Sequence, residues 1–336
     1  MSIFHQPLIN LGRQADEIRR KLWGRDTFYV KNLHINFTNV CQNRCKFCMF
    51  SRDAGAWDSY LMSAEEVVNE VRGHGSDAKE LHIVGGLHPE VGIDYYVEIL
   101  STLKVEFPEK AIKAFGAVEV EFIARQSGLP LKKLLPKLKT AGLDMMPGGG
   151  AEIFDERIRK IICPEKISGA KWLEVMEIAH DAGIKTNATM LYGHIESPDD
   201  RENHLFLIRK LQERTGGFNA FIPLAFQPHG TAISGCNPAT AIDDLYVTAA
   251  ARVLLDNIPH IKAYWVMMGE KTAQVALNFG ADDLDGTIEQ ERIAYAAGGK
   301  SRRGMSETEL RSLITSAGLK PVERDAFYVK VANNMI

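Results

Sequence analysis

The stretch Cys41-Gln42-Asn43-Arg44-Cys45-Lys46-Phe47-Cys48 decides how the rest of the sequence is interpreted. It holds three cysteines with the spacing C-x3-C-x2-C, and no fourth cysteine lies nearby. Cysteine thiolates hold iron–sulfur clusters, commonly four thiolates to a cluster. A loop that supplies three leaves one iron of a four-iron cluster open to a small molecule. The spacing therefore predicts a [4Fe-4S] cluster that takes part in chemistry, with Cys41, Cys45 and Cys48 as its ligands.

Two simpler interpretations of the cysteines fit less well. A structural zinc site closes its tetrahedron with a fourth Cys or His, and the strand pattern below points the nearest histidine, His34, elsewhere. A disulfide would use two cysteines and leave the third alone. Cys163 and Cys236 are distant in the sequence, so we expect them to be buried apolar residues.

The composition is that of a globular protein without a nucleic-acid or membrane surface. Hydrophobic residues make up 45% and charged residues 25% of the 336 residues, and the net charge is -3. This balance gives no sign of a nucleic-acid-binding face. The first residues resemble no signal peptide, and no run of 18 apolar residues would cross a membrane. Five cysteines, three of them with metal-type spacing, fit a reducing cytoplasm.

From residue 32 onward, short β-branched runs alternate with amphipathic stretches, which predicts parallel strands joined by helices. The expected strands are 33–38, 80–84, 111–117, 144–147, 185–191, 220–226 and 260–267, and the expected helices are 64–72, 95–107, 131–141, 170–182, 200–215 and 242–255. The number of repeats predicts an α/β fold, a (β/α) TIM-type barrel that is complete or nearly complete.

Segments outside the repeats are expected to flank this barrel. Residues 1–31 form an N-terminal helical extension with a helix over 8–23, and residues 32–300 form the barrel. Residues 301–336 form a C-terminal extension, a helix over 306–317 and a strand over 327–332, packed on the barrel.

The strings that suggest chemistry all follow predicted strands. The cysteine loop follows the first strand, Gly85-Gly86 ends the second, Gly148-Gly149-Gly150 follows the fourth, and 189–196 ends the fifth. Active sites of such barrels lie at the C-terminal ends of their strands, so these strings are expected to meet there.

In these features the sequence resembles the radical S-adenosylmethionine (SAM) superfamily. The cysteine spacing, the aromatic Phe47 before the last cysteine and the Gly85-Gly86 pair are marks of that superfamily. The usual acid after the glycine pair is replaced by Leu87, and His88 is a candidate for its role. Residues 189–196 follow the loose G-x-I-x-G-x-x-E pattern, with Thr189 for the first glycine.

Longer strings narrow the resemblance to the aminofutalosine synthase family of menaquinone biosynthesis by the futalosine route. They are 34–41, 50–52, 82–89, 147–154, 186–196, 221–226 and 280–287. The resemblance implies that SAM is a co-substrate, bound at the cluster and cleaved after one-electron reduction. The 5′-deoxyadenosyl radical would add to 3-[(1-carboxyvinyl)oxy]benzoate and, after rearrangement and loss of carboxylate, give 6-amino-6-deoxyfutalosine. An electron donor such as flavodoxin or ferredoxin is the implied protein partner.

The resemblance and the strand positions together give a set of candidate site residues. The candidates for contact with SAM are Phe47, Gly85, Gly86, His88, Glu152, Leu191, Tyr192 and Glu196. The candidates for contact with the substrate, whose two carboxylates need donors, are His34, Asn36, Arg52, Arg125, His194 and His229. Structural roles, such as a strand-ending turn for the glycines or a surface site for a lone His or Arg, remain alternatives.

Asp282, Asp283 and Asp285 form an acidic string, for which a solvated turn is expected rather than a metal site. Two rival functions also stay open. One is a related radical SAM enzyme, such as the cyclase of the same pathway, which would abstract hydrogen. The other is a non-catalytic zinc or iron–sulfur module.

Overall fold

The computed structural model describes residues 2–296, 298 and 301–331, and its centre is a curled parallel sheet. The sheet has seven strands in chain order, which confirms the predicted α/β barrel class. They are β2 (Asn32–Ile35), β3 (Glu80–Ile83), β4 (Ala111–Ala114), β5 (Met145–Met146), β6 (Lys185–Tyr192), β7 (Phe218–Ala225) and β8 (His260–Ile261).

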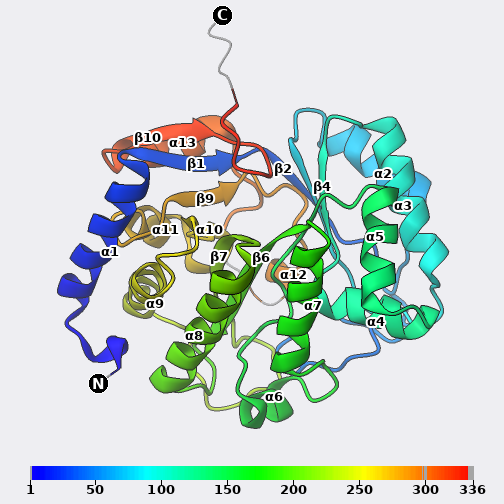
Figure 1. Cartoon of the computed structure of the whole chain (residues 1–336), viewed down its shortest axis with the longest axis horizontal. Coiled ribbons are helices and arrows are strands. Elements are labelled where there is room, and N and C mark those ends of the chain that lie inside the picture. The colour runs from blue at the N-terminus through cyan, green and yellow to red at the C-terminus, as the bar shows by residue number, and fades with distance from the viewer. Residues whose placement is uncertain (1, 297, 299–300, 332–336) are drawn as a thin grey trace, which may run out of the picture.

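Helices cover the outer face of this sheet, as Figure 1 shows for the blue-green to yellow part of the chain. Those that follow the strands are α2 (Ala64–His74), α3 (Ile93–Glu106), α4 (Ala117–Ser127), α5 (Leu131–Ala141), α6 (Glu156–Ile162), α7 (Gly169–Asp181), α8 (Pro198–Thr215) and α9 (Ala241–Leu254). Several begin where a side chain caps the first turn. Ser63, Ser197 and Thr240 each accept a backbone N–H three residues on and start α2, α8 and α9.

The chain ends pack against the barrel through a second, smaller parallel sheet. Its order is β10 (Lys320–Glu323), β1 (Asp26–Val30) and β9 (Asp283–Gly286). Helix α1 (Leu8–Trp23) packs on α9, and Figure 1 shows β10 and α13 (Glu307–Ser316) lying beside β1. No helix among the described residues has the length and apolar character needed to cross a membrane.

The segment 282–291 connects the two edges of the seven-stranded sheet. The Ala263 N–H donates to the Asp283 carbonyl (2.8 Å) on the β8 side, and the His34 N–H donates to the Glu289 carbonyl (2.9 Å) on the β2 side. The segment is irregular because Asp285, Ile288 and Gln290 have φ values of 67°, 50° and 60°. The barrel is therefore closed by a bent connection rather than by a regular eighth strand.

Several local predictions were wrong. Residues 327–331 are not a strand, and Ala332 lies outside the described residues; the C-terminal strand is β10, where Lys320–Glu323 pair with β1. The strand predicted over 111–117 ends at Ala114 and gives way to α4, and the one predicted over 260–267 gives way to the short helix α10 (Trp265–Met268).

The acidic string is not a solvated turn either. Asp282 and Asp283 are fully buried, and Asp285 is 5% exposed. They are buried because cations meet them inside the molecule: Arg252 bonds Asp282, Arg324 bonds Asp283, and Lys262 bonds Asp285. Charge pairing across distant parts of the chain leaves no local signal in the sequence.

Candidate active site

The three cysteines lie in the irregular loop after β2, at the C-terminal end of the barrel strands. All three are free thiols and line one cavity. The Cys41 N–H donates to the Arg52 carbonyl (3.1 Å), and the Lys46 N–H donates to the Ile162 carbonyl (2.8 Å), which fixes the loop at two points. Burial raises the pKa of Cys41 and raises that of Cys45 to about 12. Nearby positive charge, such as that of iron ions, would stabilise the thiolates.

The Gly85-Gly86 turn after β3 packs directly on this loop. A Cβ on Gly86 would lie 2.1 Å from the Val40 carbonyl oxygen and 3.0 Å from Cβ of Cys41. A Cβ on Gly85 would lie 2.9 Å from the Phe37 ring. Because the two glycines have no side chains, the backbone of their turn can pack directly against the cysteine loop at the cavity wall. A ligand of the cluster could therefore lie close to this turn.

The glycine run 148–150 forms the neighbouring wall. A Cβ on Gly148 would lie 2.8 Å from the backbone of β6, so this position requires glycine. The run leads into Glu152, whose carboxylate forms a 2.6 Å ion pair with Lys166. The Lys166 ammonium also lies 5.0 Å above the Phe47 ring, beside Cys45. One cation thus joins the glycine wall to the cysteine loop.

The cavity has a volume of about 340 Å³ and extends from the cysteines into the barrel. Polar residues at its inner end include His34, His82, Tyr264, Asp285 and Glu291. The His34 and His82 rings are stacked with centroids 4.4 Å apart, and Nδ1 of His34 lies 2.5 Å from the Glu291 carboxylate. Burial, followed by the charges of His34 and Lys113, holds the pKa of His82 well below its usual range. His82 is therefore a neutral imidazole at neutral pH.

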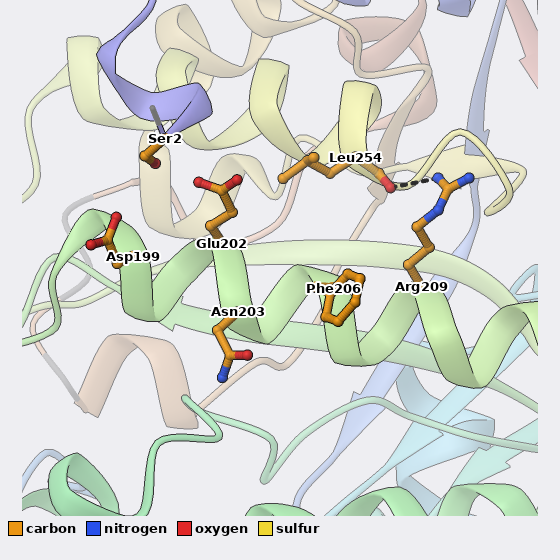
Figure 2. A pocket seen from close by; sticks show the side chains of 7 residues that line it. All are labelled: Ser2, Asp199, Glu202, Asn203, Phe206, Arg209 and Leu254. Carbon is orange, nitrogen blue, oxygen red and sulfur yellow. Dashed lines mark hydrogen bonds between the residues drawn. The ribbon is translucent and has the colours of Figure 1, made fainter.

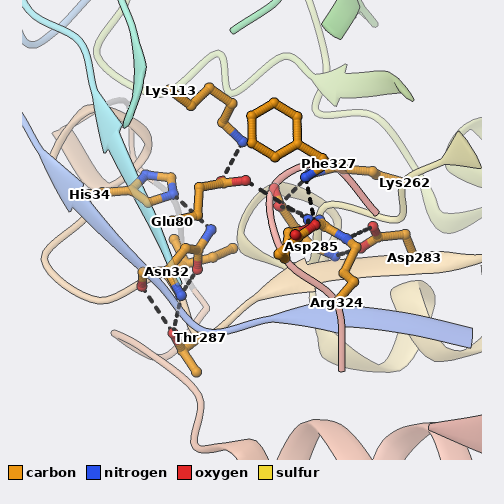
Figure 3. A network of polar contacts seen from close by, with 12 residues as sticks. Asn32, His34, Glu80, Lys113, Lys262, Asp283, Asp285, Thr287, Arg324 and Phe327 are labelled. Carbon is orange, nitrogen blue, oxygen red and sulfur yellow. Dashed lines mark hydrogen bonds and ion pairs between the residues drawn. The ribbon is translucent and has the colours of Figure 1, made fainter. Parts of the chain in front are cut away.

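A buried network of ion pairs lies under this end of the cavity (Figure 3). Lys113 pairs with Glu80, Lys262 with Asp285 (2.6 Å), and Arg324 with Asp283 (2.7 Å). Arg324 also lies 3.8 Å from Glu80 and 3.9 Å from Asp285. Three acids and three bases from β3, β4, β9, the residue after β8 and the C-terminal extension therefore balance one another. Asp285 is both part of this network and part of the cavity wall.

About half of the residues predicted for the site line the cavity. Those that do are Cys41, Cys45, Phe47, Cys48, Gly85, Gly86, Glu152, Leu191 and His34. Their individual roles stay predictions, but the fold gathers them from five separate parts of the chain, as expected for strings that follow barrel strands.

The other predicted residues do not line it. Asn36 and His88 are buried beside it, where Nδ2 of Asn36 donates to the Val84 carbonyl (3.2 Å) and Nδ1 of His88 accepts from the Glu90 N–H (3.3 Å). Arg52 pairs with Asp58 (2.7 Å), Arg125 lies half-exposed near Glu121, and His229 is exposed.

Three more candidates form a structural cluster behind β6. The Tyr192 hydroxyl donates to Asp244 (2.6 Å). The Glu196 carboxylate accepts from the backbone N–H groups of Gly193 and His194 and pairs with Arg201. Burial would raise the pKa of Glu196, but His194 and Arg201 lower it to about 2. These contacts hold the loop from β6 to α8.

The cavity also contains functional candidates that the sequence did not single out: His82, Glu119, Lys166, Tyr264 and Glu291. Asp285, which was expected in a solvated turn, lines the cavity as well. His82 could have been found, because it alternates with Leu81 and Ile83 in β3 and stands in register with His34. Glu119 carries the signal of an acid three residues after a helix start. Lys166 lies in a loop with no such pattern.

Two other observations delimit the site. A second hollow of about 430 Å³ lies on the outside between Ser2, α8 and Leu254, and Figure 2 shows that it contains none of the candidate residues. No three His, Cys, Asp or Glu side chains in 2–296, 298 and 301–331 are gathered around one point as a single metal ion would need.

Known proteins resemble this chain over nearly its whole length. Residues 35–208 match the radical SAM superfamily, and residues 215–334 match the CofH/MqnC C-terminal region. Aminodeoxyfutalosine synthase of Thermus thermophilus is 43% identical over 96% of this chain and 88% of its own length. The 5-amino-6-(D-ribitylamino)uracil–L-tyrosine 4-hydroxyphenyl transferase 1 of Methanosarcina barkeri is 42% identical over 96% of this chain and 87% of its own length.

Solved structures share the fold at low sequence identity. Methylornithine synthase (PylB) has a TM-score of 0.73 at 18% identity and covers 94% of this chain and 89% of that one. The hydrogenase maturase HydG of Carboxydothermus hydrogenoformans has a TM-score of 0.75 at 16% identity and covers 97% and 75%. With the sequence matches over nearly the whole chain and a three-thiol cavity beside a glycine pair, the chain belongs to the radical SAM superfamily, and its cofactors are a [4Fe-4S] cluster and SAM.

Proposed function

We propose that this enzyme is an aminodeoxyfutalosine synthase, which joins the 5′-deoxyadenosyl group of SAM to 3-[(1-carboxyvinyl)oxy]benzoate and releases 6-amino-6-deoxyfutalosine. The observation that carries the proposal is the 43% identity to an aminodeoxyfutalosine synthase over nearly the full length of both chains. Strings that suggested this family in the sequence, including 82–89 and 147–154, supply walls of the cavity.

Under this proposal the two ends of the cavity have different tasks. Cys41, Cys45 and Cys48 would hold the cluster, and the bound SAM would supply a 5′-deoxyadenosyl radical after one-electron reduction. Gly85, Gly86 and the glycine run would hold SAM against that end. The inner end, with His82 and Tyr264, would hold the enol ether so that its vinyl carbon faces C5′ of SAM.

The reaction would break the C5′–S bond of SAM, with methionine as the leaving group, and form a bond between C5′ and the vinyl carbon. The aryl group would then move from the ether oxygen to the adjacent carbon, the carboxylate on that carbon would leave as carbon dioxide, and the electron released would return to the oxidised cluster, so that no net oxidant is consumed. The chain's own residues contribute orientation and exclusion of water. The single-electron reductant, such as a flavodoxin or ferredoxin, would have to come from outside the chain.

Two uncommitted donors support a substrate with carboxylates. Among the described residues, neither a ring nitrogen of His82 nor the Tyr264 hydroxyl has a hydrogen-bond partner, although both side chains line the cavity. Burial raises the pKa of Tyr264 well above its usual range, so its hydroxyl remains a donor. Buried polar groups normally have partners, and a carboxylate could accept from both.

A second candidate function follows from the transferase relatives. Several 5-amino-6-(D-ribitylamino)uracil–L-tyrosine 4-hydroxyphenyl transferases are 40–43% identical over 94–98% of this chain. An enzyme of that kind would take its 4-hydroxyphenyl group from tyrosine, and its substrates carry amines rather than a dicarboxylate.

One experiment separates the candidates. The anaerobic, cluster-loaded enzyme is incubated with a reductant and SAM labelled with ¹³C at C5′, once with the enol ether and once with tyrosine plus the aminouracil. We expect the label in a product that contains both adenine and the benzoate ring. Label found only in free 5′-deoxyadenosine would replace our proposal. A product of 4-hydroxyphenyl transfer to the aminouracil beside it would favour the transferase, and a cyclised substrate would favour the cyclase.

A further inference from the structure

Four carboxylates line the cavity, and three of them have a basic side chain as a direct partner. Glu152 pairs with Lys166 (2.6 Å), Asp285 with Lys262 (2.6 Å), and Glu291 lies 2.5 Å from Nδ1 of His34. In the described part of the chain, the fourth carboxylate, that of Glu119, has no ion-pair partner. The cavity therefore contains one acid whose charge the protein itself does not balance.

Glu119 is fixed in place by backbone groups. It is the third residue of α4, and its Oε2 accepts from the Gly116 N–H (2.7 Å), as in a capping box. Its Oε1 accepts from the N–H of Gly85 (3.0 Å), in the turn that packs on the cysteine loop. A carboxylate has about four lone-pair sites, so about two stay available. The small exposed part of the side chain, 9%, opens on the cavity.

The backbone contacts and the N-terminus of α4 do not fully offset the burial of this charge. Burial raises the pKa of Glu119 to about 7, while the bonds from Gly116 and Gly85 and the more distant Lys166 act in the opposite direction. Tyr96 supplies no countercharge nearby, because burial, and then the charge of Glu119, raise its pKa and keep it neutral. A cation entering the cavity beside Gly85 would complete the balance.

We propose that Glu119 binds the α-ammonium group of SAM. The position after the glycine pair, where an acid is usual, holds Leu87 in this chain, and Glu119 would supply the missing carboxylate from helix α4. SAM carries two cationic centres, the ammonium and the sulfonium. Only the ammonium donates hydrogen bonds, and spare carboxylate lone pairs prefer such a donor. The ammonium belongs to the methionine part of SAM, which in this superfamily lies at the cluster, and Gly85-Gly86 joins Glu119 to the cysteine loop.

The test measures dissociation constants on the anaerobic, cluster-loaded enzyme by equilibrium dialysis, for SAM and for its analogue without the amino group. In Glu119→Gln we expect SAM affinity to fall by about 10- to 100-fold, the range of a charge-assisted hydrogen bond. The affinity for the analogue should fall much less, so the ratio of the two dissociation constants should move closer to one. Glu121→Gln, on the same helix but outside the cavity wall, should leave both constants unchanged.

A structural role gives a different result. If Glu119 only held the turn, Glu119→Gln would lower the affinities for SAM and for the analogue by the same factor, and that outcome would overturn the proposal. Should Glu119→Gln fail to fold, as shown by iron content and melting, Glu119→Asp serves instead. It keeps the charge on a shorter side chain, so it should bind SAM more weakly yet still prefer SAM to the analogue, and an unaltered SAM affinity would count against the contact.

Discussion

Gly86 shows how closely single residues are fitted around the cavity. Its backbone is not in the left-handed conformation, so other residues could adopt its φ and ψ angles. The requirement is contact: a Cβ would meet the Val40 carbonyl carbon at 2.7 Å and its oxygen at 2.1 Å. Because Val40 directly precedes Cys41, any movement that relieves this contact also moves a cysteine that is proposed to bind the cluster.

We therefore expect Gly86→Ala to lower both SAM affinity and iron content per chain, with a cost of about 1–3 kcal/mol in unfolding free energy. Iron analysis, SAM binding and urea unfolding measure these three effects. Gly73→Ala in α2 is the matched control, because nothing lies within 4 Å of its Cβ position. A Gly86→Ala protein with normal iron and SAM binding would show that the turn can move independently of the loop.

Tyr264→Phe removes one hydroxyl from the inner end of the cavity and changes little else. If that hydroxyl donates to a substrate carboxylate, KM for the enol ether should rise by about tenfold or more, while SAM affinity stays the same. An unchanged kcat would indicate a contact of equal strength in ground and transition state, and a lower kcat would indicate that it orients the vinyl carbon. If the Tyr264→Phe enzyme shows an unchanged KM in steady-state kinetics, the hydroxyl does not bind the substrate.

At the scale of elements, the connection from β6 to α8 depends on Glu196. Its carboxylate accepts two backbone N–H bonds and pairs with Arg201, and its pKa of about 2 lies below the usual 4.5. A lowered folded-state pKa stabilises the protein above pH 4.5, and this contribution disappears as pH falls from 4.5 toward 2. The shift corresponds to about 3 kcal/mol.

We expect Glu196→Gln to be less stable than the parent at pH 7, and the difference between the two to narrow as the pH falls through this window. Urea unfolding at a series of pH values gives that difference directly. Glu174→Gln, on the exposed face of α7, provides the comparison. A difference that does not change with pH would mean that the charge of Glu196 is not what holds the loop.

The elements that the sequence did not reveal are those whose stability depends on distant partners. Strand β7 is a largely apolar run between helices, and β3 alternates polar Glu80 and His82 with apolar Leu81 and Ile83, so these patterns were sufficient to predict both strands. Strand β9 reads Asp-Leu-Asp-Gly, which no local rule assigns to a sheet. It is a buried strand because Lys262 and Arg324 neutralise its acids. The site residues divide in the same way. The spacing of the cysteines made Cys41 a candidate, whereas Lys166 is brought to the cavity only by contacts with distant residues.

Arg324 tests this explanation. Arg324→Met leaves Glu80, Asp283 and Asp285 with only Lys113 and Lys262, and an unbalanced buried charge costs about 3–5 kcal/mol. Chemical unfolding should show a loss of this size. Lys330→Met removes a mostly exposed partner of Asp26 from the same extension and should cost about 1 kcal/mol or less. Equal losses in the two variants would mean that the network adds nothing beyond surface pairing.

At the scale of the whole molecule, the chain ends complete the barrel that lies between them. Sequence patterns predicted the barrel and the gathering of the cysteine loop and the glycine strings at one end, because that end is where parallel strands point. They did not predict the sheet of β10, β1 and β9, because parallel pairing between residues 26–30 and 320–323 involves no local pattern.

The ion network under the cavity has a consequence for how the protein is made. During synthesis Asp283 and Asp285 leave the ribosome before Arg324 does, so until the C-terminal extension arrives the three buried acids Glu80, Asp283 and Asp285 have only Lys113 and Lys262 to balance them. Asp285, which forms part of the cavity wall, cannot reach its final environment before that moment. We therefore expect cofactor loading to be post-translational, and nascent chains stalled before residue 320 to be unable to retain SAM.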